Sequence, residues 1–168
     1  MFPDHLRTDA EQLLAMLRQR GLSLATAESC TGGLIAALIT DIPGSSDVFD
    51  RGFVTYSNDA KTDMLGVRSE VLTSHGAVSR EAALAMAEGA LLHSISQIAI
   101  AVTGLAGPGG GTREKPVGLV HLAAARIGSL PQHREYRFGP LSREAIRIQA
   151  VEVALALIRC AADAPACE

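Results

Sequence analysis

The sequence predicts an α/β fold of three layers, in which helices cover both faces of a mixed β-sheet. Two observations predict this class. Segments with helical patterning and segments with strand patterning alternate along the first part of the chain, as they do in βαβ units. Two further strand-like segments, 117–126 and 134–138, then follow each other directly and favour a late antiparallel hairpin.

Helical periodicity and turn-forming residues define the elements of the first half. Leucines and alanines between Leu6 and Leu17 recur at the spacing of one helix face, and Gly21 follows as a stop signal. The expected elements are a helix over 4–20, a strand over 22–27, a helix over 34–39, a loop over 41–50, a strand over 52–56 and a short helix capped by Ser57 or Asn58.

The second half contains the most apolar strand and the most irregular segment. Ser79 is expected to cap an alanine-rich helix. Five glycines and two prolines between Gly104 and Pro116 predict a shaped loop. The expected elements are a helix over 80–92, a strand over 97–103, a loop over 104–116, strands over 117–126 and 134–138, and a long helix over 142–160.

Length and composition fit a single domain. The chain has 168 residues, of which 48% are apolar. A chain of this length buries roughly two thirds of the surface that its unfolded form exposes, so it needs neither a metal ion nor disulfides to hold a core. We expect one domain over residues 1–168, with its core over about 4–160 and a frayed tail over 161–168.

Charge and hydropathy exclude several classes of function. The net charge is −3 and only 20% of residues are charged, which argues against nucleic acid as a partner because phosphate binding needs a basic face. The apolar runs are far shorter than the ~20 residues that span a membrane. Residues 1–5 lack the pattern of a signal peptide, and the three cysteines lack metal spacing, which predicts a cytoplasmic protein with reduced thiols.

The first candidate site is the segment 28–33, which follows a strand and precedes a helix, where α/β folds bind ligands. Free N–H groups of the first helical turn are expected to stabilise a negative oxygen near Ser29, a candidate nucleophile. Cys30 is a rival nucleophile. A plain helix cap with a glycine turn is the alternative that involves no chemistry.

The second candidate site, over 56–61, contains one of only two lysines among fifteen basic residues, the other being Lys115. Lys61 is expected in the first turn of a helix, where the helix dipole and partial burial lower the pKa of a lysine and make it a candidate general base. Tyr56 could extend a proton relay. A surface lysine and a half-buried strand tyrosine are the alternatives.

Two more segments offer ligand contacts. The glycine-rich loop after Thr103 matches neither a dinucleotide-binding motif nor a P-loop, but its backbone can curl around a ligand beside the Thr103 hydroxyl. Arg143 and Arg147 share one helix face and can hold a phosphate or a carboxylate, with ion pairs to Glu144 or other acids as the alternative. The five histidines show no metal spacing, so we expect no metal site and no catalytic histidine.

These motifs occur together and in order in one known family. The chain resembles the CinA carboxy-terminal domain family through residues 28–33, 55–58 with Lys61, 75–79 and 103–118, and the resemblance runs over about 22–158. Members of this kind are nicotinamide-nucleotide amidases, which hydrolyse nicotinamide mononucleotide to nicotinic acid mononucleotide and ammonia. Longer members carry an additional amino-terminal domain, for which 168 residues leave no room, so the resemblance is to the stand-alone form.

The resemblance implies a role for each polar residue of the motifs. Ser29 would be the nucleophile, Lys61 its base, Tyr56 and Thr103 supporting groups, and Arg143 the phosphate contact. It also implies a small-molecule partner, nicotinamide mononucleotide, a homodimer, and no cofactor. Contacts to the substrate are expected from Thr31, Gly32, Gly33, Gly104, Gly107, Arg143 and Arg147.

A serine beside a neutral lysine can attack a carboxamide and then protonate the departing ammonia without histidine or metal. The alternative is a module that binds a pyridine nucleotide, or has a regulatory role, without turnover. Lys61 argues against it, because a pure binder in an arginine-rich chain has no evident need of a lysine there.

Overall fold

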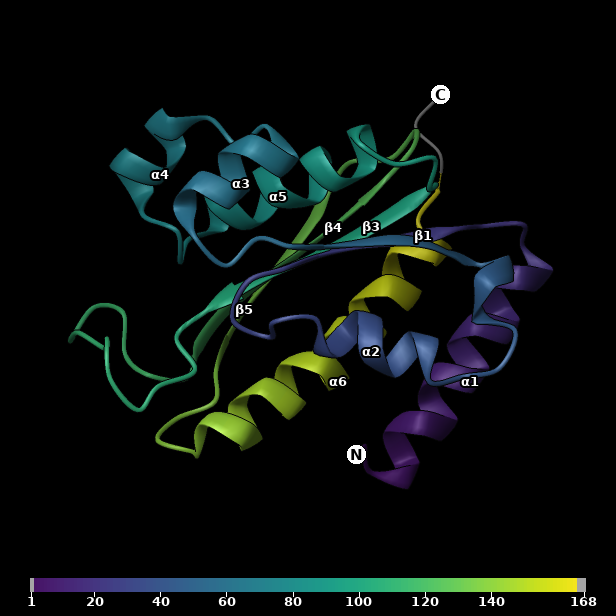
Figure 1. Ribbon diagram of the computed structural model, residues 1–168, viewed down its shortest axis with the longest axis horizontal. Coiled ribbons are helices and arrows are strands. Elements are labelled where there is room, and N and C mark those ends of the chain that lie inside the picture. The colour runs from purple at the N-terminus through teal and green to yellow at the C-terminus, as the bar shows by residue number, and fades with distance from the viewer. Residues whose placement is uncertain (1, 166–168) are drawn as a thin grey trace.

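The computed structural model describes residues 2–165 and consists of one sheet with helices on both of its faces (Figure 1). Its elements are, in order, α1 (Asp4–Gln19), β1 (Leu24–Glu28), α2 (Leu34–Thr40), the 3₁₀ turn η1 (Ser45–Asp47), β2 (Phe49–Val54), α3 (Asn58–Leu65), α4 (Ser69–His75), α5 (Arg80–Leu92), β3 (Ile98–Gly104), β4 (Leu119–Arg126), β5 (Gln132–Arg137) and α6 (Arg143–Asp163).

The five strands lie in the order β2-β1-β3-β4-β5. β1 runs parallel to both of its neighbours, β2 and β3, whereas β4 runs antiparallel to β3 and to β5. This arrangement confirms the expected mixed sheet with a late hairpin. The chain leaves β1 for β2 on one side and returns to β3 on the other, so the carboxyl ends of all three strands meet at one edge, where open α/β sheets bind ligands.

The two faces of the sheet differ in the size of their side chains. In Figure 1, α1, α2 and α6 cover one face and α3, α4 and α5 cover the other. Strand residues alternate between these faces. The face toward α6 carries large aliphatic residues, namely Leu24, Ile98, Ile100, Val102, Val120 and Leu122. The face toward α5 carries alanines, namely Ala25, Ala27, Ala99, Ala101, Ala123 and Ala125.

A close contact between two helices fixes the position of α3. Gly89 in α5 lies so near the end of α3 that a Cβ atom on it would come within 2.0 Å of the carbonyl oxygen of Leu65. Only glycine allows the two backbones to approach this closely. Since α3 carries Lys61, this contact also determines where that lysine enters the site.

The structure confirms the expected fold class and corrects three local predictions. The expected loop over 41–50 is wrong in part, because η1 lies within it and β2 already begins at Phe49, where it pairs with Leu24 of β1. Helix α4, for which no element was expected, is a single short surface element. Apart from the start of β2, the strand ends lie within two residues of the expected ones.

The frayed tail expected over 161–168 is the third correction. α6 continues to Asp163, because Ala161 and Ala162 are buried and their carbonyl oxygens accept hydrogen bonds from the Arg126 guanidinium. Residues 166–168, which include Cys167, lie outside the described part of the chain. Within it, Cys30 and Cys160 are both free thiols.

Candidate active site

The turn that carries Ser29 begins where β1 ends. The Ser29 N–H donates to the carbonyl oxygen of Val102 on β3, so the first residue of the turn is still tied to the sheet. Gly32 and Gly33 then adopt positive φ angles of 60° and 93°, which glycine adopts readily, and the chain enters α2. The sheet therefore fixes the Ser29 backbone, and the two glycines permit the sharp exit into the helix.

The Glu28 side chain caps the amino terminus of α2. It is fully buried, and its two carboxylate oxygens accept hydrogen bonds from the N–H groups of Gly33, Ile35 and Ala36 at 2.9–3.1 Å. The expectation that first-turn N–H groups are free for an anion is therefore wrong, because a carboxylate of the chain itself occupies them. Among residues 2–165, the N–H groups of Cys30 and Thr31 donate to no other residue.

Lys61 enters the site from α3, whose first turn is capped by Ser57: the Ser57 hydroxyl accepts a hydrogen bond from the Ala60 N–H at 3.0 Å. The Lys61 side chain is 1% exposed. Its Nζ lies 3.0 Å from Ser29 Oγ, 2.8 Å from the carbonyl oxygen of Thr55 and 3.4 Å from that of Ser57. The two carbonyls thus hold the amine in front of the serine hydroxyl.

Burial controls the protonation of both Lys61 and Cys30. Burial lowers the pKa of Lys61 below its ordinary value of 10.5, and among residues 2–165 the neighbouring charge that opposes this effect is a Cys30 thiolate. Burial raises the pKa of Cys30 to about 12, so this thiolate does not form near neutral pH. The same environment therefore favours a neutral amine at Lys61 and keeps the rival nucleophile Cys30 as an unreactive thiol.

Thr103 lies at the end of β3 and is almost fully buried. Its hydroxyl donates to the carbonyl oxygen of Ala77 at 2.7 Å. The proton of this hydroxyl is therefore engaged in the segment between α4 and α5, and only the oxygen lone pairs remain to accept a hydrogen bond from a ligand.

The two arginines of α6 make different contacts. Arg143 donates to the carbonyl oxygen of Gly107 at 2.8 Å and to the Tyr56 hydroxyl at 3.0 Å, so it joins the glycine-rich loop to the segment after β2. Arg147, one turn later, donates to the carbonyl oxygen of Thr31 at 2.7 Å. The Tyr56 hydroxyl is thus bonded to Arg143, and within residues 2–165 it makes no hydrogen bond to Ser29 or Lys61.

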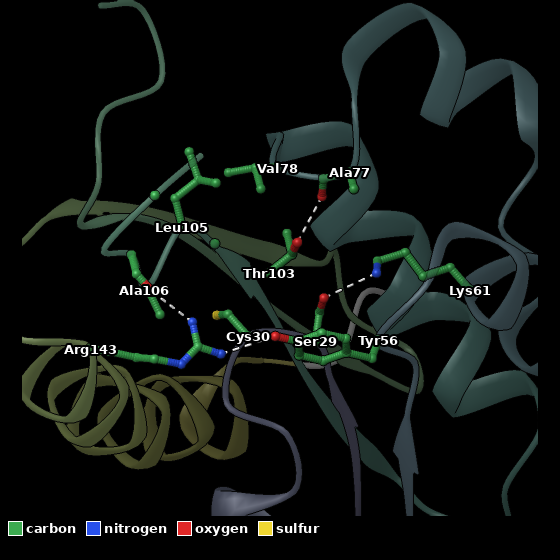
Figure 2. A pocket seen from close by; sticks show the side chains of 13 residues that line it. Ser29, Cys30, Tyr56, Lys61, Ala77, Val78, Thr103, Leu105, Ala106 and Arg143 are labelled. Carbon is green, nitrogen blue, oxygen red and sulfur yellow. Dashed lines mark hydrogen bonds between the residues drawn. The ribbon is translucent and has the colours of Figure 1, made fainter. Parts of the chain in front are cut away.

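These side chains surround a pocket of about 250 Å³ at the edge of the sheet where the parallel strands end. Figure 2 shows Lys61 and Arg143 reaching it from opposite sides, with Thr103 between them. Its lining includes Ser29, Cys30, Tyr56, Lys61, Thr103, Gly104, Gly107 and Arg143, and among the described residues it includes no carboxylate. Thr31, Gly32, Gly33 and Arg147, which we also expected to contact a ligand, lie outside the lining.

Two parts of the site lie in the quoted motifs but have no role assigned to them by the sequence. Glu28 belongs to the quoted motif but was not a candidate, although an acidic residue at the end of a buried strand and just before an apolar helix is a capping signal. Ala77 and Val78 also line the pocket. No side-chain chemistry marks them in the sequence, and only the packing of the segment between α4 and α5 brings them there.

In residues 2–165, no helix combines the length and the apolar character that crossing a membrane requires.

Comparison with known proteins identifies the family of the chain and several of its relatives. The family described as CinA C-terminal domain matches residues 6–161. The nicotinamide-nucleotide amidohydrolase PncC of Escherichia coli is 50% identical over 147 residues, which cover 87% of this chain and 88% of that protein. A CinA-like protein of Chloroherpeton thalassium is 59% identical over 120 residues, or 71% of this chain. The chain spans only 26–31% of the length of this and two other curated relatives.

Solved structures agree with the fold. The competence/damage inducible protein CihA from Agrobacterium tumefaciens has a TM-score of 0.95 and 52% sequence identity, with 97% of this chain and 99% of that chain covered. A CinA superfamily protein from Escherichia coli has a TM-score of 0.88 and 32% identity, with 95% of this chain and 92% of that chain covered.

Proposed function

Because the chain belongs to the CinA C-terminal domain family, we propose that it is a nicotinamide-nucleotide amidase, which converts nicotinamide mononucleotide to nicotinic acid mononucleotide and ammonia. The observation that carries this proposal is the 3.0 Å contact between the buried Lys61 amine and the Ser29 hydroxyl at the floor of a pocket. The Escherichia coli relative, the nicotinamide-nucleotide amidohydrolase PncC, supports the choice of substrate.

The first half of the reaction forms an acyl-enzyme on Ser29. The carbonyl oxygens of Thr55 and Ser57 accept the two N–H bonds of neutral Lys61, which leaves its lone pair for the serine proton. Ser29 Oγ attacks the carboxamide carbon while Lys61 Nζ takes that proton. Lys61 then gives the proton to the amide nitrogen, the C–N bond breaks, and ammonia leaves.

The second half returns the enzyme to its starting state. A water molecule attacks the ester carbon and gives its proton to neutral Lys61, the bond to Ser29 Oγ breaks, and the protonated amine restores the serine hydroxyl. The N–H groups of Cys30 and Thr31, which have no other acceptor among residues 2–165, are the candidates to stabilise the oxyanion of both tetrahedral intermediates.

The rest of the pocket suits the other parts of the mononucleotide. Arg143 stands at the side of the pocket opposite Lys61 (Figure 2) and keeps guanidinium donors beyond the two that bind Gly107 and Tyr56, so it can receive the phosphate. Val78 and Leu105 provide apolar lining for the pyridine ring. The pocket holds about 250 Å³, just below the ~300–1,000 Å³ that is typical of small-molecule sites.

The direct test is release of ammonia after nicotinamide mononucleotide is added to the purified protein, with the acid product identified by mass spectrometry. We expect turnover by the parent protein and none above background by Ser29→Ala. Binding of the mononucleotide without ammonia release would instead support a non-catalytic nucleotide-binding module.

A further inference from the structure

The nucleophile turn, residues 29–33, is held from two layers of the molecule. From the sheet, Glu28 binds the N–H groups at its exit into α2. From α6, the Arg147 guanidinium reaches across and donates to the Thr31 carbonyl oxygen, 116 residues away in sequence. Apart from Lys61 at Ser29 Oγ, Arg147 is the only side chain from another helix that bonds to this turn within residues 2–165.

The turn has little else to fix its shape. Gly32 and Gly33 have no side chains to pack, and both adopt positive φ angles. The Thr31 hydroxyl is buried but has no hydrogen-bond partner among the described residues, so it does not anchor the turn. The nearest atom to a Cβ built on Gly32 would be the terminal nitrogen of Arg147, at 3.5 Å, which shows that the guanidinium lies against the turn.

Arg147 is poorly placed to bind a ligand. One terminal nitrogen is committed to Thr31, the Nε atom is buried, and the residue does not line the pocket. Arg143, one turn earlier on the same helix, does line it. The two arginines that the sequence places on one helix face therefore separate into a residue at the pocket and a residue at the turn.

We propose that Arg147 is a positioning residue for Ser29: it binds the Thr31 carbonyl and so holds the serine hydroxyl in line with Lys61 and the substrate carbon. This inference rests on the amidase function proposed above. The test of this role is whether loss of Arg147 slows the reaction of Ser29 without weakening the binding of the substrate phosphate.

Arg147→Ala should lower kcat for nicotinamide mononucleotide by about ten- to a hundredfold, the range that a hydrogen bond from a charged group provides, and change KM by less than about threefold. The same factor is expected with nicotinamide riboside, which lacks the phosphate. Free guanidinium ion should restore part of the kcat of Arg147→Ala, and Arg147→Lys should lie between the parent and Arg147→Ala because lysine keeps one donor.

Arg159→Ala is the matched control. Arg159 also lies on α6 and donates to both the carbonyl oxygen and the carboxylate of Asp9 in α1, so its loss removes an arginine contact of the same helix far from the turn. We expect this variant to lose thermal stability while it keeps the parent kcat. If the loss of any arginine contact simply destabilised α6, kcat would fall in both Arg147→Ala and Arg159→Ala.

Labelling of Ser29 by a fluorophosphonate reads out its placement without the natural substrate. We expect labelling of Arg147→Ala to slow by about the same factor as kcat, and labelling of Arg159→Ala to stay at the parent rate. A parent protein that is labelled but releases no ammonia would overturn the amidase function alone, and the labelling rates would still decide the role of Arg147.

Two results would overturn the positioning role. A rise in KM for the mononucleotide alone, with unchanged kcat and labelling, would make Arg147 a ligand of the phosphate. Unchanged kcat in Arg147→Ala, or an equal loss in Arg159→Ala without guanidinium rescue, would leave Arg147 with structural importance only.

Discussion

Lys61 Nζ lies 3.0 Å from Ser29 Oγ, although the two residues are 32 positions apart in the sequence. Parallel pairing of β1 and β2 brings them together. Glu28 pairs with Val54, so Ser29 and Thr55 leave the sheet side by side, and α3 then returns Lys61 to the serine. The dyad is thus a direct product of strand register, and a slip by one residue would separate it.

Substitution of Lys61 tests its role as a base. Lys61→Arg should be nearly inactive although it keeps the positive charge, because arginine does not lose its proton in this pH range. Lys61→Met should show a similar loss. A lysine that merely attracted the substrate phosphate would behave differently, since arginine would then replace it well. Substantial ammonia release by Lys61→Arg would refute the role of base.

The pH dependence of turnover follows from the same residue. Only neutral Lys61 accepts the serine proton, and burial lowers its pKa below 10.5. We therefore expect kcat/KM to rise with pH through this lowered pKa and to level off before the range in which an exposed lysine titrates. Measurement of kcat/KM for ammonia release over a range of pH checks this. A reaction that does not depend on Ser29 serves as the control for effects of pH on the assay. A rate that falls over the same range would contradict it.

Stability should change with pH in a related way. Between the lowered pKa of Lys61 in the folded chain and its ordinary value in the unfolded chain, the unfolded state binds more protons, so the free energy of unfolding rises with pH across this window. Lys61→Met lacks this contribution and should be more stable than the parent near neutral pH. Urea unfolding of both proteins at several pH values measures the difference.

Ser29 and Cys30 are adjacent, and their substitutions separate the two candidate nucleophiles. Ser29→Ala should reduce ammonia release to background. Cys30→Ala should keep most of the turnover, because burial raises the pKa of this thiol to about 12. If the two outcomes were exchanged, Cys30 would be the nucleophile.

Arg143→Ala tests the phosphate contact. A hydrogen bond from a charged group contributes roughly 1.5 to 3 kcal/mol, so kcat/KM for nicotinamide mononucleotide should fall by about ten- to a hundredfold. Nicotinamide riboside should be a poor substrate for the parent, and the substitution should hardly worsen it. Equal losses with both substrates would show that Arg143 supports the pocket through Gly107 and Tyr56 instead.

The sequence predicts the fold well, and it singles out residues that the structure brings together around the pocket, because both leave local signals. Helical periodicity predicts α1, an alanine-rich composition with the Ser79 cap predicts α5, and the strand-turn-helix order places Ser29 at the edge of the sheet. The rarity of lysine singles out Lys61. Such features depend on neighbours in the sequence and can be read without a structure.

The contacts that the sequence does not reveal depend on distant segments. Whether the N–H groups of α2 are free depends on where Glu28 directs its carboxylate. The different roles of Arg143 and Arg147 depend on which loop each guanidinium meets across the sheet edge. Two arginines on one helix face look alike in the sequence. Only the packing of α6 against β3 and β4 distinguishes them, because it brings Arg147 to the turn after β1 and Arg143 to the glycine-rich loop.

The close approach of Gly89 to Leu65 also bears on how sequence changes in this protein should be interpreted. Gly89 does not line the pocket, yet even one methyl group there would displace α3 and with it the amine of Lys61. In an activity screen, an inherited or engineered Gly89→Ala change would therefore have the same effect as the loss of a residue in the pocket. Among homologues, retention of this glycine would be an indirect sign that the contact between Lys61 and Ser29 is retained.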